Sequence, residues 1–523
     1  MQKENLVDTV FNNLIQEYSC IYDFLSENDA VLKRGVKNIL FDAYTMSYDP
    51  HSAYFSQEKK KRFTKALSSN TYQFGFQLEK NSTGQFEITH LEPGSPAWNS
   101  NKLNEGDVIL SLNLNGKSVN FSCREGNEIV GGISGINSEK LKMKVKKQNG
   151  LIEIHTLFSE VIENIENHIH GYLLEGERKV GYIGLPAFYT QWDNSASTGC
   201  ANDVGKELMK LQQENIDGLI LDLRDNGGGS LTEALPLSGA FVSEGSLCIM
   251  NTRHNKPRLQ KDPNRGKLYS GPLVVLINEY SASASEVTAG ILQDFNRAII
   301  VGNKSFGKAT GQQMIPIRSA YSPSQREFVP TKDNTGYLKL TSLELYNLKG
   351  ISHQGSGIQP DIKLPSQYEN SSYQEKDMAY YIKIESIEKK TYYTPEADLP
   401  IEELKKISST RVTLDTAYQR INGLIKTIYK PAETNQSINL QLNALKETIE
   451  NNEINNGISL TDLEYIQNLY KAVIPSYDAA IYSFNATKSE LSEATKQLLN
   501  TDSEIVESYR IINDLIKLKS QTK

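Results

Sequence analysis

Three serines cluster where an apolar run of the sequence gives way to a helical pattern. The run Pro272 to Asn278 is almost entirely apolar and β-favouring, which is typical of a strand covered on both faces. The letters SASASE follow, with Ser283 at their centre, and apolar residues then recur at helical spacing. A serine at a strand-to-helix turn lies at the carboxyl end of a sheet, where open α/β sheets place their sites. The unpaired N–H groups of the helix start can bind a developing oxyanion there.

Serine needs a base beside it to act as a nucleophile. Histidine, the usual base, does not occur between Gly271 and Gln312. Lys308 is the alternative, because it follows the next β-rich run, Ala298 to Gly302. A lysine acts as a base near neutral pH only where burial lowers its pKa. The neighbouring Phe306 indicates an apolar surrounding of this kind.

Ser283 also has an interpretation without catalysis. Ser283 and Glu286 have the S-x-x-E spacing of a capping box, in which the serine only caps the following helix. One hydroxyl does not easily serve both as a cap and as a nucleophile. The spacing alone leaves the two roles open.

These letters resemble the motifs of the C-terminal processing peptidases, and most closely those of the tail-specific proteases of bacterial envelopes. SASASE and FGK-x-x-x-Q, preceded by LDLRDNGGG, carry the resemblance, which runs from about Tyr44 to about Pro365. It implies a Ser–Lys protease in which Ser283 is the nucleophile and Lys308 is the general base. Gln312 would orient the lysine.

The resemblance also implies an oxyanion hole made by the backbone N–H groups of Ala284 and Gly229. The sequence departs from the commonest family form at Ala309 and Gly311, where glycine and valine are usual. Neither position supplies a catalytic side chain, so the departure concerns local loop geometry. The resemblance implies no metal and no cofactor.

Residues 71–158 have another character, with short β-like runs between turn letters. The runs are Phe74–Leu78, Phe86–Leu91, Asp107–Leu112, Leu141–Val145 and Ile152–Phe158. The segment NEGDVILSLNLNGKS resembles the signature of PDZ domains, which bind a peptide as an added strand and hold its carboxylate on backbone N–H groups. The loop would be Phe74, Gly75 and Phe76, and the two aromatic residues predict substrates with apolar C-termini. The alternative is a small β domain whose phenylalanines only fill its core.

The resemblance implies a multidomain α+β fold, in which a crotonase-like protease core of ββα units carries an inserted PDZ domain and flanking helical regions. We expect a helical N-terminal region over residues 1–70, the PDZ domain over 71–158, the core over 159–368 and a helical C-terminal region over 369–523. In the core, runs such as Gly218–Leu223 alternate with helical patterns. Asn251–Lys267 is polar and predicts an irregular surface excursion. In the C-terminal region, Leu440 to Ile449 has helical spacing.

Composition limits the other possibilities. The 523 residues are 38% apolar and 23% charged, which is typical of a soluble globular protein of several domains. A net charge of −7 and the lack of a basic run of nucleic-acid type argue against nucleic acid as a partner. No apolar run is long enough to span a bilayer, and the start MQKENLVDTVF is not a signal peptide. The resemblance nevertheless implies the periplasm or cell envelope, which would require a leader that has been removed.

The sequence therefore predicts a serine endopeptidase whose PDZ domain holds the apolar C-terminus of an unfolded or tagged protein. An adaptor protein is a further expected partner. The competing hypothesis is a catalytically silent PDZ scaffold, against which the presence of Ser283, Lys308 and Gln312 argues. A crotonase-type acyl-CoA enzyme is a weaker rival, because it needs no Ser–Lys pair.

Overall fold

The computed structural model describes residues 29–521, with gaps at 68–69, 82–83, 93, 120, 122–125, 135–137, 164–168, 191–198, 253–254, 263, 323–326, 367–372, 389–390, 417, 421, 424–467 and 485. Two compact units make up the chain. The first unit comprises residues 1–168, 191–195 and 312–341, and the second comprises 169–190, 196–311 and 342–523. The helix predicted over Leu440 to Ile449 lies outside the described residues.

A seven-stranded sheet forms the centre of the second unit. Its strands, in spatial order, are β21 (Ile362–Lys363), β16 (Ile299–Gly302), β15 (Leu273–Ile277), β12 (Gly218–Asp222), β11 (Lys179–Gly184), β10 (Gly171–Gly176) and β22 (Tyr470–Val473). The strands from β21 to β11 are parallel, and β10 is antiparallel to both of its neighbours. The predicted strands at Pro272–Asn278 and Gly218–Leu223 are confirmed.

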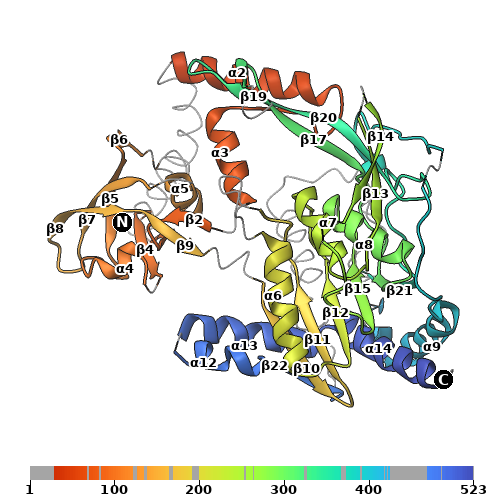
Figure 1. The fold of residues 1–523 in the computed structure, drawn as a ribbon. Coiled ribbons are helices and arrows are strands. Elements are labelled where there is room, and N and C mark those ends of the chain that lie inside the picture. The colour runs from red at the N-terminus through yellow and green to blue at the C-terminus, as the bar shows by residue number, and fades with distance from the viewer. Residues whose placement is uncertain are drawn as a thin grey trace, which may run out of the picture. The chain divides into compact units, whose positions relative to one another are not determined.

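Helices cover both faces of this sheet, as its continuous apolar strands require (Figure 1). In β15, Val275 packs in the core formed with α6 (Cys200–Gln213), α7 (Leu231–Gly239) and α8 (Ala284–Asp294). Its neighbours Val274 and Leu276 point to the opposite core, which includes residues of α9 (Ile401–Leu414), α13 (Ala486–Thr501) and α14 (Ser503–Gln521). Period-two alternation thus divides each buried strand between two helical layers.

The C-terminal region contains α9, α12 (Ser476–Phe484), α13 and α14 as expected, and it also contributes β22, which pairs with β10 at the edge of the central sheet. One expectation is wrong in part: residues 251–252 and 255–261 are not irregular, because β13 (Ser246–Thr252) and β14 (Asn255–Lys261) form an antiparallel hairpin there. β14 is polar, and its pairing with β13 outweighs its weak local pattern.

The β domain of the first unit has its core on one side of a twisted sheet. Its strands are β3 (Phe76–Lys80), β4 (Phe86–Leu91), β5 (Val108–Leu114), β7 (Lys140–Lys146) and β8 (Ile152–Phe158), with β6 (Lys117–Ser118) beside β5. Helices α4 (Pro96–Asn99) and α5 (Gly126–Ile133) accompany them. The predicted strands Phe86–Leu91 and Ile152–Phe158 have the bounds that the structure shows. Alternating residues such as Ile88, Met143 and Val145 are completely buried in this core.

The described residues form further helices and strands. They are α2 (Asp29–Met46), β1 (Ala53–Phe55), α3 (Gln57–Ala66), β2 (Asn70–Gln73), β9 (Glu160–Glu163), β17 (Thr310–Pro316), β18 (Ser319–Ser322), β19 (Glu327–Pro330), β20 (Tyr337–Tyr346), a 3-10 turn at Glu375–Asp377 and α12 (Ser476–Phe484). Cys200 and Cys248 are buried free thiols, and Cys20 and Cys123 lie outside the described residues. Among the described residues, no helix combines the length and apolar character that crossing a bilayer needs.

Candidate active site

Ser283 lies at the turn between β15 and α8. Its φ of 56° is in the left-handed region, which a serine adopts only where its surroundings impose it. The other two serines of the cluster are completely buried and hold the turn in place. The Ser281 hydroxyl donates to the carbonyl of Leu223 at 2.7 Å, and that of Ser285 donates to the carbonyl of Asn226 at 2.8 Å. Of the three, only Ser283 is partly exposed.

The glycine-rich turn after β12 packs directly against this serine. A Cβ atom on Gly228 would lie 2.8 Å from the Cβ of Ser283 and 3.0 Å from the amide nitrogen of Ala284, so no side chain fits there. The Gly228 carbonyl accepts a hydrogen bond from the N–H of Phe188 at 2.9 Å. In a trans peptide the N–H of Gly229 then points away from Phe188. Ala284 begins α8, so helix geometry leaves its N–H without an intrahelical acceptor.

A buried carboxylate joins the serine turn to the lysine loop. The side chain of Glu286 is completely buried. Its Oε2 accepts the backbone N–H of Ser283 at 2.8 Å and that of Lys308 at 2.8 Å. Its Oε1 accepts the Ser305 hydroxyl at 2.5 Å and the N–H of Gly307 at 2.7 Å. The backbones of the predicted nucleophile and base are therefore neighbours across a single oxygen atom.

Hydrogen-bond donors and the nearby His353 stabilise the charge of Glu286. Burial raises its pKa above the usual value, and His353 and the donors from Ser305, Lys308 and Ser283 oppose part of this rise. His353 Nε2 lies 3.9 Å from Oε2 and 3.1 Å from the carbonyl oxygen of Lys308. Four donors occupy the two carboxylate oxygens, and a protonated carboxyl would have to give up one of these bonds. The arrangement fits an ionised Glu286.

Lys308 is half-buried at the end of the loop that follows β16. Its Nζ donates to the carbonyl of Thr310 at 2.9 Å. The neighbouring Phe306 is buried, and its ring centroid lies 5.3 Å from that of Tyr373. An apolar surrounding of the lysine amine remains a prediction.

Gln312 belongs to the first unit, and its amide is held by a chain of hydrogen bonds within that unit. Its Nε2 donates to Thr341 Oγ1 at 3.1 Å, and that hydroxyl donates to Asp49 Oδ1 at 2.8 Å. Burial alone would raise the pKa of Asp49, but hydrogen bonds from Ser52, Thr341 and His51 outweigh it and lower this pKa. The turn around Asp49 therefore sets the orientation of the Gln312 amide.

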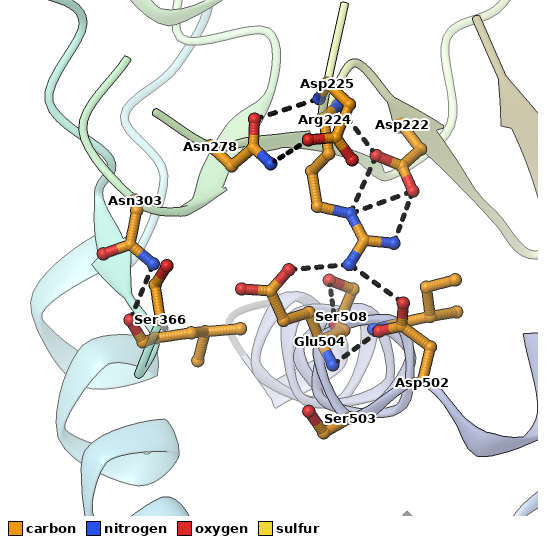
Figure 2. Close-up of polar contacts among 12 residues, drawn as sticks. Asp222, Arg224, Asp225, Asn278, Asn303, Ser366, Asp502, Ser503, Glu504 and Ser508 are labelled. Carbon is orange, nitrogen blue, oxygen red and sulfur yellow. Dashed lines mark hydrogen bonds and ion pairs between the residues drawn. The ribbon is translucent and has the colours of Figure 1, made fainter. Parts of the chain in front are cut away.

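A charged cluster around Arg224 joins the end of β12 to the start of α14 (Figure 2). The guanidinium of Arg224 donates to Asp222 through Nη2 at 2.6 Å and to Glu504 through Nη1 at 2.6 Å. The same Nη1 lies 2.9 Å from Asp502 Oδ2. Asp502 in turn accepts the backbone N–H of Glu504 at 2.8 Å, at the start of α14. The start of α14, the C-terminal helix, therefore contacts the arginine that follows β12.

Asp225, the residue after Arg224, joins the glycine-rich turn to the serine turn. The amide of Asn278, which follows β15, donates to Asp225 Oδ1 at 2.9 Å and accepts the backbone N–H of Asp225 at 2.9 Å. The hydroxyl of Ser281 accepts the N–H of Asn278 at 2.9 Å. The glycine-rich turn and the serine turn therefore form one hydrogen-bonded unit.

The proposed peptide-binding loop of the first unit is fixed by its own backbone. Gly75 has a φ of 77°, which favours glycine. Its carbonyl accepts the N–H of Glu92 at 3.0 Å, and that of Phe74 accepts the N–H of Ala97 at 2.9 Å. The side chains of Phe74 and Phe76 lie in the core of the domain, so a role in holding a peptide would rest on the backbone of this loop.

Sequence reasoning gave several of these residues smaller roles or none. Glu286 was interpreted only as part of a capping box, although its S-x-x-E spacing was a usable signal. Arg224 belongs to the LDLRDNGGG motif, but the sequence analysis assigns it no role. Glu504 lies 280 residues away from Arg224 and offered no local signal for this contact. Among the described residues, no group of three or more His, Cys, Asp or Glu side chains could hold a metal ion.

Comparison with known proteins identifies two domains. Residues 179–364 match the profile of peptidase family S41, and residues 64–146 match that of the PDZ domain. The chain is 31% identical to a tail-specific protease of Haemophilus influenzae over 344 residues, which cover 65% of this chain and 47% of that protein. It is 28% identical to a carboxy-terminal-processing protease of Bartonella bacilliformis over 363 residues, which cover 68% and 76%. The predicted resemblance and PDZ domain are thereby confirmed, although the chain spans only about half the length of the first relative.

Solved structures show a weaker likeness. A photosystem II D1 C-terminal processing protease matches with a TM-score of 0.35 and 19% identity, over 66% of this chain and 86% of that one. A likeness at this level says nothing about the site.

Replacing Glu286 with glutamine tests the buried carboxylate. Glutamine keeps the shape but turns one acceptor oxygen into an NH2 group, which faces donors. Because unsatisfied buried donors cost about 1–3 kcal/mol each, we expect the free energy of unfolding to fall by about 2–4 kcal/mol. Denaturant unfolding followed by circular dichroism measures this. Glu403→Gln, on the exposed side of α9, is the matched control, and equal stability of the two variants would contradict the role of Glu286.

Glu504 predicts a pH dependence of stability. Burial raises its pKa to about 7, against the lowering effect of Arg224 and with a further rise from Asp502. A raised pKa means that the folded protein holds this proton more tightly than the unfolded chain does. The stabilisation is present at acid pH and is lost as the pH rises to about 7. Relative to the parent, Glu504→Gln should therefore gain about 1–3 kcal/mol between pH 5 and pH 8.

Unfolding curves of both proteins across this pH range check the sign. Glu403→Gln serves again as the control, because its carboxylate is exposed. Parallel pH profiles for the parent and Glu504→Gln would mean that Glu504 stays ionised in the folded protein.

Proposed function

We propose that this chain, which joins a peptidase family S41 domain to a PDZ domain, is a serine endopeptidase that works through an acyl-enzyme. The observation that carries the proposal is the Glu286 oxygen shared by the backbones of Ser283 and Lys308. It supports a Ser–Lys dyad because it places the two residues at adjoining turns. Both turns follow neighbouring parallel strands, β15 and β16, at the edge where α/β sheets hold their sites.

The reaction follows from these positions. The hydroxyl oxygen of Ser283 attacks the carbonyl carbon of the substrate, and its proton passes to the neutral Nζ of Lys308. The N–H groups of Ala284 and Gly229 stabilise the negative charge on the carbonyl oxygen. The lysine then gives its proton to the leaving amine, an ester to Ser283 remains, and water hydrolyses it. Gln312 orients the lysine.

The PDZ domain supplies substrate selection in this proposal. It would hold the apolar C-terminus of an unfolded or tagged protein on the backbone of Phe74, Gly75 and Phe76, so that the preceding chain reaches Ser283. An adaptor protein and a location in the periplasm or cell envelope belong to the same proposal. The match to the PDZ profile supports peptide binding at this domain.

The dyad is tested by replacing its members. We expect Ser283→Ala and Lys308→Ala each to reduce kcat/KM on an unfolded reporter protein by roughly a thousandfold or more, because each removes a group that acts only in the chemical step. Quantitative gel electrophoresis of the products measures the loss. Ser409→Ala and Lys406→Ala, at exposed positions of α9, are the matched controls. Cleavage that survives Ser283→Ala would show that another residue is the nucleophile.

Substrate selection is tested by changing only the tail of the reporter. With apolar residues at its C-terminus, we expect a kcat/KM about tenfold or more above that of the same reporter ending in charged residues. The difference should lie mainly in KM, because the tail binds away from the reacting carbonyl. Equal cleavage of the two reporters would remove the apolar-tail preference and leave the dyad standing. Tail binding without any cleavage would favour a silent scaffold.

A further inference from the structure

The outer face of strands β7 and β8 carries two parallel rows of exposed side chains. We call it the lysine–apolar face. One row, on β7, is Lys140, Lys142, Lys144 and Lys146, and the other, on β8, is Ile152, Ile154, Thr156 and Phe158. The residues between them in sequence, such as Leu141 and Met143, point the other way into the core. The lysines therefore occupy this face because their positions alternate with core positions.

Strand pairing sets the two rows directly beside each other. Lys144 lies opposite Ile154, and Lys140 lies opposite Phe158 with its Nζ 6.0 Å from the ring centroid. The apolar members are 55–59% exposed, which is unusual for residues of this size. The fold of the domain does not account for this exposure, because its core lies on the opposite side of the sheet.

The charge of this face is of one sign. Neither strand places a carboxylate on it, since Glu153 alternates to the inner side and contacts His155 Nε2 at 2.9 Å. Among the described residues, none of the four lysines forms an ion pair. The lysines lie on β7, which is paired on both sides, so they are not charges that keep an edge strand from pairing. The edge strand β8 carries the apolar row, which itself favours association.

We propose that the lysine–apolar face docks on the surface of an anionic lipid bilayer. The lysines complement negatively charged headgroups, and the apolar row enters the boundary between headgroups and acyl chains. Phe158 has the amphipathic setting of an interfacial anchor, with a lysine over its ring. Apart from Thr156, the face holds only long flexible lysines and apolar side chains, a combination that suits a fluid lipid surface.

The net charge of the whole chain strengthens this choice. The protein carries −7, so an anionic surface repels most of it and attracts this face. Docking would therefore be oriented, with the PDZ sheet toward the lipid. The sequence showed no such basic patch because the lysines alternate with buried residues. The inference does not depend on the proposed peptidase activity.

Vesicle sedimentation with the full chain tests the proposal. Phosphatidylcholine vesicles are compared with vesicles in which a third of the lipid is phosphatidylglycerol. We expect binding to the anionic vesicles only, weakening as salt is raised. Each lysine near an anionic surface strengthens binding roughly fivefold, so Lys142→Glu with Lys144→Glu should weaken it about a hundredfold or more. Ile152→Ser with Ile154→Ser should reduce the binding that remains at high salt.

The matched control reverses the charge of two exposed lysines outside this face. Lys405→Glu with Lys406→Glu, on α9, changes the net charge by the same amount and should keep most of the binding. Thermal unfolding and cleavage of a soluble reporter should be unchanged in all three double variants, which separates loss of docking from loss of fold or activity.

Three results would overturn the proposal. One is equal, weak binding to both vesicle types at low salt. Another is equal loss of binding in the α9 control, which would mean that net charge alone decides. The third is binding of soluble polyglutamate, but not of vesicles, that depends on Lys142 and Lys144. That result would assign the face to an acidic protein.

Discussion

The site depends on one buried carboxylate that receives four hydrogen bonds. Glu286 is completely buried, so the loss of any of its donors would leave part of its charge unsatisfied. Two of its hydrogen bonds come from the backbones of Ser283 and Lys308, which belong to turns after neighbouring strands. The buried carboxylate therefore fixes the distance between the serine turn and the lysine loop.

A second charged cluster joins the central sheet to the C-terminal helix. Arg224 follows β12 and ends in contact with Asp502 and Glu504 at the start of α14. The strand residues of β12 and β15 alternate between two helical layers, of which one includes α8 and the other includes α14. The C-terminal region is therefore part of the framework of the site, and not a separate helical addition.

The local sequence pattern predicted those strands and helices whose formation depends mainly on neighbouring residues. The buried runs predicted β12 and β15, short β-like runs predicted β4 and β8, and the serine cluster was predicted at a strand-to-helix transition. The contacts that hold the site were beyond such reasoning. Gln312 meets Thr341 and Asp49, and β22 pairs with β10, across long stretches of chain. No local periodicity encodes such a pairing, because each partner is compatible with many others until the chain is folded.

The strained backbone of Ser283 explains why so many hydrogen bonds hold the residues around it. A left-handed serine costs of order 1–3 kcal/mol and persists only where its neighbours leave no alternative. Ser281, Ser285 and Glu286 fix the backbone on both sides of it, and Gly228 allows the adjoining turn to approach without a side chain. These contacts hold Ser283 in its strained conformation directly before Ala284, the first residue of α8, whose N–H has no acceptor within the helix.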